Sequence, residues 1–99
     1  MRKELRFHPD IYQEIKEAYD WYELGSAGLG EDFLEELERA YSLIQRFPDM
    51  WPVMEKNIRR YLLKRFPYCV IYKIKEDCIL IAAIMHLSRK PDYWSDRIM

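Results

Sequence analysis

The residues best suited to chemistry in this sequence are cations and aromatics gathered in its second half. A first group, within residues 59–65, comprises Arg59, Arg60, Lys64 and Arg65, with Tyr61 among them. A second group, within residues 86–97, comprises His86, Arg89, Lys90, Tyr93, Trp94 and Arg97. Guanidinium groups bind carboxylates and phosphates through paired, charge-assisted hydrogen bonds. Both groups therefore suit contact with a polyanion or an acidic partner, although a basic strand is also a common solvated edge.

His86 is the one residue in these two groups whose side chain commonly transfers protons near neutral pH. With Arg89 nearby, it has the chemistry to act on an RNA ribose hydroxyl while arginines stabilise the phosphate charge. Equally, its imidazole can hydrogen-bond the backbone and fix the loop that follows the strand. Because no second acid or base lies near it in the sequence, the structural role is the favoured reading.

Other kinds of site find little support. The two histidines, His8 and His86, lie in no metal-binding array, and no glycine pattern matches a phosphate-binding loop. No serine stands in a nucleophile elbow. Cys69 and Cys78 lie in stretches rich in Val, Ile and Tyr, so we expect buried, reduced thiols in a reducing compartment. No metal and no cofactor is expected.

Charge divides the chain in two. Residues 1–57 hold seven Lys and Arg against thirteen Asp and Glu, a net charge of −6; residues 58–99 hold nine against four, a net charge of +5. The split indicates either a positive face for an acidic partner or two halves that neutralise each other within one domain.

The first half predicts elements that could position these cations. Residues 3–7 alternate polar and apolar side chains, as a short half-buried strand does. Apolar residues at helical spacing follow from residue 11, with Glu14, Glu17, Asp20 and Glu23 on the wet face and Gly25 as the C-cap. After a joint at residues 25–30, a second amphipathic helix runs from residue 31 until Phe47-Pro48 ends it.

The second half predicts a sheet that covers the two helices. Residues 49–57 are expected to be a connector. Strands are expected at 58–65, 68–75 and 78–85, with a two-residue turn at Glu76-Asp77 and a last helical turn within 91–97. Alternation along the first of these strands would put Arg60 and Lys64 on one sheet face, and Arg59 and Arg65 on the other.

The expected fold class is α+β in the order β-α-α-β-β-β: a two-helix hairpin packed on an antiparallel sheet, with a short C-terminal helical turn. The length predicts a single domain, residues 1–99. No apolar run is long enough for a membrane span, and no signal peptide is expected, so the expected location is the cytoplasm. The residues predicted to be largely buried between helices and sheet are Ile15, Tyr19, Phe33, Leu37, Tyr41, Ile44, Ile81 and Ala83.

An ordered set of motifs then gives a resemblance. Ile58-Arg59-Arg60, Arg65-Phe66-Pro67-Tyr68 and Ile71-Tyr72 are followed by His86-x-x-Arg89-x-Pro91-x-x-Trp94-x-x-Arg97. This set resembles the RelE/ParE superfamily, the toxins of type II toxin–antitoxin modules, often labelled plasmid stabilisation proteins. The resemblance covers essentially the whole chain, and it is closer to the ParE side.

What the resemblance implies is a toxin silenced by a cognate antitoxin. ParE-like members inhibit DNA gyrase, whereas RelE-like members cut mRNA on the ribosome; a non-toxic binding relative is a third alternative. The nuclease reading would use Arg65 and His86 as catalytic candidates. Binding of the target or antitoxin is expected to use Arg59, Arg60, Lys64, Arg65, Arg89, Trp94 and Arg97. A homodimer and a hetero-oligomer with the antitoxin both stay open, and no membrane partner is expected.

Overall fold

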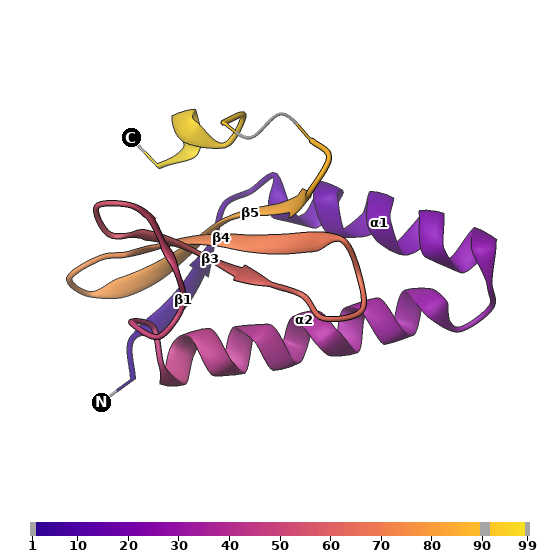
Figure 1. The fold of residues 1–99 in the computed structure, drawn as a ribbon, viewed down its shortest axis with the longest axis horizontal. Coiled ribbons are helices and arrows are strands. Elements are labelled where there is room, and N and C mark those ends of the chain that lie inside the picture. Colours follow the sequence, from indigo (N-terminus) through magenta and orange to yellow (C-terminus); the bar gives the residue numbers. More distant parts are fainter. Residues whose placement is uncertain (1, 90–91, 99) are drawn as a thin grey trace.

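The protein is an α+β fold, and the computed structural model describes its residues 2–89 and 92–98. In chain order the elements are β1 (Glu4–Phe7), α1 (Ile11–Gly25), α2 (Leu29–Arg46), β2 (Val53–Glu55), β3 (Ile58–Leu62), β4 (Tyr68–Ile74), β5 (Cys78–His86) and a 3₁₀ turn (Ser95–Arg97). Figure 1 shows the two helices as a hairpin beside the sheet, with the C-terminal turn on the other side. The predicted fold class, helix hairpin and terminal turn are confirmed.

The sheet differs from the prediction in two details. Its strand order is β1-β5-β4-β3-β2, and β1 runs parallel to β5, so the sheet is mixed and not wholly antiparallel. A parallel pair needs a long crossover, which the helix hairpin and the meander between β1 and β5 supply. The predicted connector at residues 49–57 also contains a short strand, β2, which pairs with β3 through an irregular register.

The joint between the helices depends on a glycine and a carboxylate. Gly28 has a φ of 89°, a left-handed conformation that favours glycine, and it precedes α2. Gly25, the predicted C-cap, is instead the last residue of α1. The Glu23 carboxylate accepts hydrogen bonds from the backbone N–H groups of Gly28 (2.9 Å) and Gly30 (2.8 Å), so it caps the positive end of α2.

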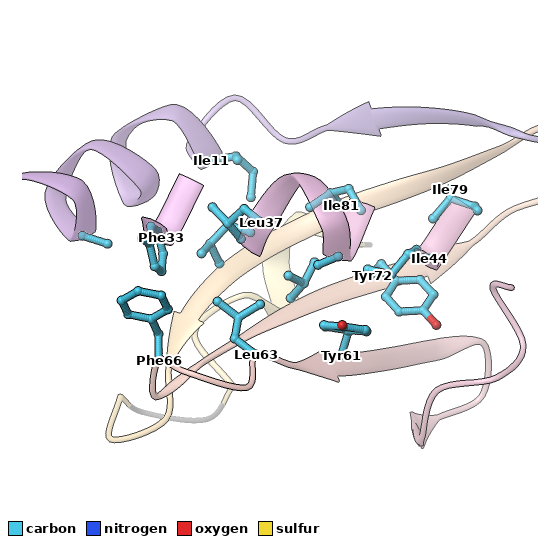
Figure 2. Packing of buried hydrophobic residues seen from close by; sticks show 14 residues of the cluster. Ile11, Phe33, Leu37, Ile44, Tyr61, Leu63, Phe66, Tyr72, Ile79 and Ile81 are labelled. Carbon is cyan, nitrogen blue, oxygen red and sulfur yellow. The ribbon is translucent and has the colours of Figure 1, made fainter. Parts of the chain in front are cut away.

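The main core lies between the hairpin and one sheet face. Figure 2 shows Phe33 and Leu37 of α2 above Phe66 and Leu63, next to the sheet. The Phe33 and Phe66 rings meet edge to face, with centroids 5.2 Å apart. This confirms the predicted burial of Phe33, Leu37, Ile44 and Ile81, whereas Ile15, Tyr19 and Tyr41 are only partly buried.

A second, smaller core lies on the opposite sheet face. It contains Trp94 and Ile98, which pack with the buried residues Ile58, Cys69, Ile71, Ala82, Ala83 and Met85. Ala83 is therefore buried as predicted, but on the face away from the helices. The cause is an irregularity in the ladder: Ile71 pairs with Ala83 and Tyr72 with Ile81, so Ala82 is an extra residue and two successive alanines share a face.

Both cysteines are buried free thiols, as predicted. They do not lie in adjacent rows of the sheet. Cys69 opposes Met85 near the end of β5, whereas Cys78 opposes Glu4 at its start. Among the described residues, no helix has the length and apolar character needed to cross a membrane.

Candidate partner-binding surface

Exposed cations gather at one end of the sheet, where β4 begins and β5 ends. The Leu87 N–H donates to the Pro67 carbonyl at 2.8 Å, which joins the β3–β4 loop to the segment after β5. We call Lys64, Arg65, His86 and Arg89 the basic end of the sheet. Lys64, Arg65 and Arg89 are exposed and His86 is partly buried. The structure thus brings part of both predicted groups together.

A buried carboxylate holds the first of these segments. Glu36 of α2 is 5% exposed and accepts hydrogen bonds from the backbone N–H groups of Lys64 and Arg65, the latter at 3.3 Å. Charge-assisted bonds of this kind fix a loop strongly. Sequence reasoning missed Glu36, although its position next to Leu37 and three residues after Phe33 places it near the apolar face of the helix.

The predicted alternation of cations fails at Lys64 and Arg65, because β3 ends at Leu62 and the loop turns toward α2. The Arg65 guanidinium lies 3.3 Å from the Asp32 carboxylate and stacks over the Phe66 ring, yet its side chain is 58% exposed. Lys64 and Arg65 line a small cavity of about 130 Å³ together with Arg39, Tyr61 and the Glu36 carboxylate. Three cations thus meet at this loop.

His86 is held by its own loop. Its Nδ1 accepts a hydrogen bond from the Ser88 N–H at 3.0 Å and lies 2.7 Å from the Ser88 hydroxyl. The Tyr68 ring meets the imidazole edge to face, with centroids 5.0 Å apart. An Nδ1 that accepts from a backbone N–H places the proton of a neutral imidazole on Nε2. No carboxylate pairs with His86 among the described residues, so its contacts are those of a loop-fixing residue.

Arg59 also has structural contacts. Its guanidinium donates to the carbonyl of Asp49 at 3.0 Å and to that of Trp51 at 2.7 Å, and its side chain is 19% exposed. It therefore ties the segment before β2 to β3. Arg60, the next residue, is half-buried on β3, and its charge acts on Cys69.

The C-terminal segment is fixed by a buried ion pair. Arg97 lies 2.9 Å from the Glu14 carboxylate and donates to the Ala82 carbonyl at 3.0 Å. Burial lowers the pKa of the Arg97 guanidinium, but the hydrogen bond and charge of Glu14 more than offset this, and the pKa lies above its ordinary value. Tyr93 donates to the same carboxylate at 2.8 Å.

Glu14 also satisfies a backbone N–H of β5 beyond the end of β1. The register of β1 with β5 stops at Phe7 and Ile81, and the Glu14 carboxylate accepts from the Ile84 N–H at 2.9 Å. The prediction that Glu14 lies on the wet face is therefore wrong: its side chain is 9% exposed. Nothing in helical periodicity distinguishes it from Glu17, since its partners come from residues 84–97.

Two further residues of the predicted binding set lie in this segment. Trp94 is 4% exposed and packs in the smaller core. Arg89, by contrast, is exposed, and its guanidinium lies 4.1 Å from the centroid of the Tyr93 ring. The structure therefore separates exposed Lys64, Arg65 and Arg89 from the largely buried Arg59, Trp94 and Arg97.

A second surface was not anticipated. Three large side chains of α1 are strongly exposed: Tyr12 (74%), Trp21 (73%) and Leu24 (87%). Trp21 and Leu24 border a groove of about 420 Å³ at the tip of the hairpin. The signal lay in the sequence, because these residues fall outside the buried stripe of the helix. Exposed apolar groups that share a surface commonly mark a protein interface.

The described residues contain no cluster of three or more His, Cys, Asp or Glu side chains that could hold a metal ion. No cofactor site was predicted. The arrangement at the basic end presents positive charge and hydrogen-bond donors on a fixed backbone, which is chemistry for binding an anionic surface.

The comparisons with known proteins agree with this fold. Residues 5–91 match the family described as the ParE toxin of the type II toxin–antitoxin system, parDE. Among curated proteins, none matches the chain. A solved structure of the chromosomal ParDE TA system from P. aeruginosa is similar, with a TM-score of 0.75 and 16% sequence identity over 87% of this chain and 97% of that chain. At that identity the likeness concerns the fold. Because the family match spans most of the sequence, from β1 through β5, this chain belongs to the ParE toxin family of type II toxin–antitoxin systems.

Proposed function

We propose that this ParE-type toxin inhibits DNA gyrase and is neutralised by a cognate antitoxin. The observation that carries the proposal is the family match over residues 5–91, which includes the helix hairpin and all four residues of the basic end. Inhibition by binding needs a rigid surface of matched charge and shape, and no proton-transfer group.

The contacts of His86 favour inhibition by binding over RNA cleavage. A general base must present a nitrogen to the hydroxyl that it deprotonates. Here the Nδ1 of His86 is taken by Ser88, at 3.0 Å from its N–H and 2.7 Å from its hydroxyl. The imidazole holds the loop that carries Arg89.

The antitoxin is proposed to cover both unusual surfaces. An acidic segment suits the basic end, where Lys64, Arg65 and Arg89 are exposed. Apolar side chains suit the groove beside Trp21 and Leu24. A flexible segment that spans both surfaces would lose conformational entropy on binding. The contacts that it makes over a wide area would compensate for this loss.

The test compares two activities of one purified protein, gyrase supercoiling and mRNA cleavage on ribosomes. We expect loss of supercoiling activity, no ribosome-dependent cleavage, and relief of inhibition by the antitoxin. In cells, induction should trigger DNA damage signalling before translation falls.

His86→Gln separates the two readings further. The glutamine amide is able to hydrogen-bond within the loop but does not transfer protons at neutral pH. We expect this variant to keep substantial toxicity and to bind antitoxin. A nuclease that used His86 would lose about 10²–10⁴-fold in rate.

A further inference from the structure

The outer edge of β1 is open. β1 pairs with β5 on one side and has no strand on the other among the described residues. The His8 N–H donates to the Ile81 carbonyl, and alternation then turns the backbone groups of Arg6 and Glu4 toward β5 as well. Leu5 and Phe7 consequently present their N–H and C=O groups outward. An edge of this kind is a template for another strand.

The side chains along this edge alternate in charge on one sheet face. Leu5 and Phe7 face the helices, because Leu5 packs on the main core and the Phe7 ring meets Tyr41 with centroids 5.2 Å apart. Glu4 and Arg6 therefore share the other face, 3.3 Å apart, with side chains 65% and 55% exposed. Like charges along an edge would repel the same edge of a second copy. Opposite charges two residues apart can instead pair with each other when a second copy lies antiparallel.

Leu5 could pair with Lys3, Leu5 or Phe7 of a second copy. Only one of these three registers both forms the backbone hydrogen bonds and sets opposite charges against each other. In an antiparallel pair, residues with outward backbone groups must face each other. Pairing Leu5 with Phe7 would set Arg6 against Arg6, and pairing Lys3 with Leu5 would set Glu4 against Glu4. Pairing Leu5 with Leu5 sets Glu4 against Arg6 twice. These charged residues then occupy the closer, non-hydrogen-bonded positions, where opposite charges attract most.

The same edge leaves other groups unsatisfied. A groove of about 310 Å³ runs beside it, lined by Leu5, Phe7, Tyr41 and polar residues of α2. Phe7 is 45% exposed, and the Tyr41 hydroxyl is buried without a hydrogen-bond partner among the described residues. At the beginning of the strand, the Gln45 amide donates to the Lys3 carbonyl at 2.8 Å, which keeps the open seam short and centred on Leu5.

We propose that two copies of this chain associate through β1, antiparallel and centred on Leu5, so that two Glu4–Arg6 ion pairs join the two sheets into one. The inference does not depend on which target the toxin inhibits. A seam centred on Leu5 and made by residues 4–6 of each copy is small beside the roughly 1,200–2,000 Å² that a stable interface buries. The dimer is therefore weak and depends on concentration.

Sedimentation velocity of the purified full chain tests this over a wide concentration range. The mass should rise from the 12.2 kDa monomer toward twice that value. Glu4→Arg and Arg6→Glu should each hold the chain as a monomer at concentrations where the unmodified chain is half dimeric. An equimolar mixture of these two variants should associate, and the double variant Glu4→Arg/Arg6→Glu should recover self-association. Lys16→Glu, an exposed reversal on α1, serves as the charge control and should dimerise normally.

Circular dichroism of each variant verifies that it is folded before its mass is interpreted. Three results would overturn the proposal: an unmodified chain that stays monomeric throughout, a dimer that survives either single reversal, or two single variants that fail to associate when mixed. If one reversal weakens the fold, the double variant keeps the test decisive, because it again places opposite charges at positions 4 and 6.

Discussion

Single side chains in this protein often satisfy backbone groups that regular structure leaves open. Glu14, Glu23 and Glu36 each accept from backbone N–H groups, at a sheet irregularity, a helix start and a loop. All three lie on helices whose other carboxylates face water. A buried donor that loses its partner costs about 1–3 kcal/mol, so these carboxylates matter for stability well beyond their number.

Glu14→Ala should therefore be strongly destabilising. It removes the closer carboxylate partner of Arg97. It also removes the hydrogen-bond acceptor of the Ile84 N–H and of the Tyr93 hydroxyl. Breaking a largely buried pair costs about 3–5 kcal/mol. We expect a fall of this order in the free energy of unfolding, measured by urea denaturation. Glu17→Ala, one turn along the same helix and exposed, is the matched control and should change it by less than about 0.5 kcal/mol. Equal effects would show that the network stabilises nothing.

Cys69 should be chemically inert in the folded state. Burial raises the pKa of its thiol to about 11, while a neighbouring Arg60 lowers it less. An unfolded thiol ionises near pH 8.5. Because the unfolded thiol loses its proton before the folded one does, the free energy of unfolding is unaffected by Cys69 below about pH 8.5 and falls as the pH rises from there toward about 11.

At pH 8, iodoacetamide should modify neither Cys69 nor Cys78 in the native protein and both in urea, as read by mass spectrometry. Ser26→Cys adds an exposed thiol that should react at once and so verifies the reagent. Rapid native modification of Cys69, or a Cys69–Cys78 disulfide in protein from cytosolic expression, would contradict the burial.

The helices and strands depend on local signals that the sequence carries openly, and the helix hairpin illustrates this. Phe33, Leu37 and Ile44 follow helical spacing, and Phe47-Pro48 ends α2 at the predicted place. The β4 and β5 strands likewise follow from their apolar, β-prone runs. The fold class could therefore be predicted from periodicity and turn residues alone.

Long-range pairing could not be predicted in the same way. The parallel alignment of β1 with β5 joins residues more than seventy positions apart, and β2 is a short strand of exposed residues with no apolar pattern. For the same reason Glu14 resembled an ordinary surface carboxylate, because its partners lie beyond residue 80. Of the predicted binding residues, sequence spacing could not separate exposed Arg89 from enclosed Arg97, since only the fold decides which guanidinium meets a carboxylate.

Leu37→Ala tests the helix that faces the sheet. Leu37 is 1% exposed in the main core, and large-to-small changes at such sites cost about 2–5 kcal/mol. The denaturation midpoint should fall accordingly. Leu24→Ala, at a position 87% exposed on α1, removes the same atoms and should barely shift the midpoint. A Leu37→Ala variant as stable as Leu24→Ala would mean that the core is wrongly placed.

Across the whole molecule, the acidic and basic halves partly neutralise each other, and the basic half also leaves a positive surface exposed. Three arginines from the basic half pair with carboxylates of the acidic half: Arg59 with Asp49, Arg65 with Asp32, and Arg97 with Asp10 and Glu14. Lys64 and Arg89 remain exposed, and Arg65 is more than half exposed despite its pair. The basic half therefore both closes the fold and offers a positive surface.

Charge reversal at the basic end should weaken binding without unfolding the protein. The variant Lys64→Glu/Arg89→Glu should bind the antitoxin at least tenfold more weakly, mainly through slower association at low salt. Isothermal titration and stopped-flow kinetics measure the two effects. Lys16→Glu/Lys75→Glu, which reverses two exposed charges away from the basic end, is the matched control for added negative charge and should bind normally. If the control weakens binding as much as the double variant, the effect is one of net charge and not of this surface.

The most direct measurement of the central claim places gyrase supercoiling and ribosome-dependent mRNA cleavage side by side, using the same purified chain and its His86→Gln variant. The account predicts that both proteins inhibit supercoiling, that neither cleaves mRNA, and that the antitoxin relieves the inhibition. Codon-positioned cleavage that disappears in His86→Gln, with supercoiling untouched by either protein, would contradict it and identify the chain as an endoribonuclease.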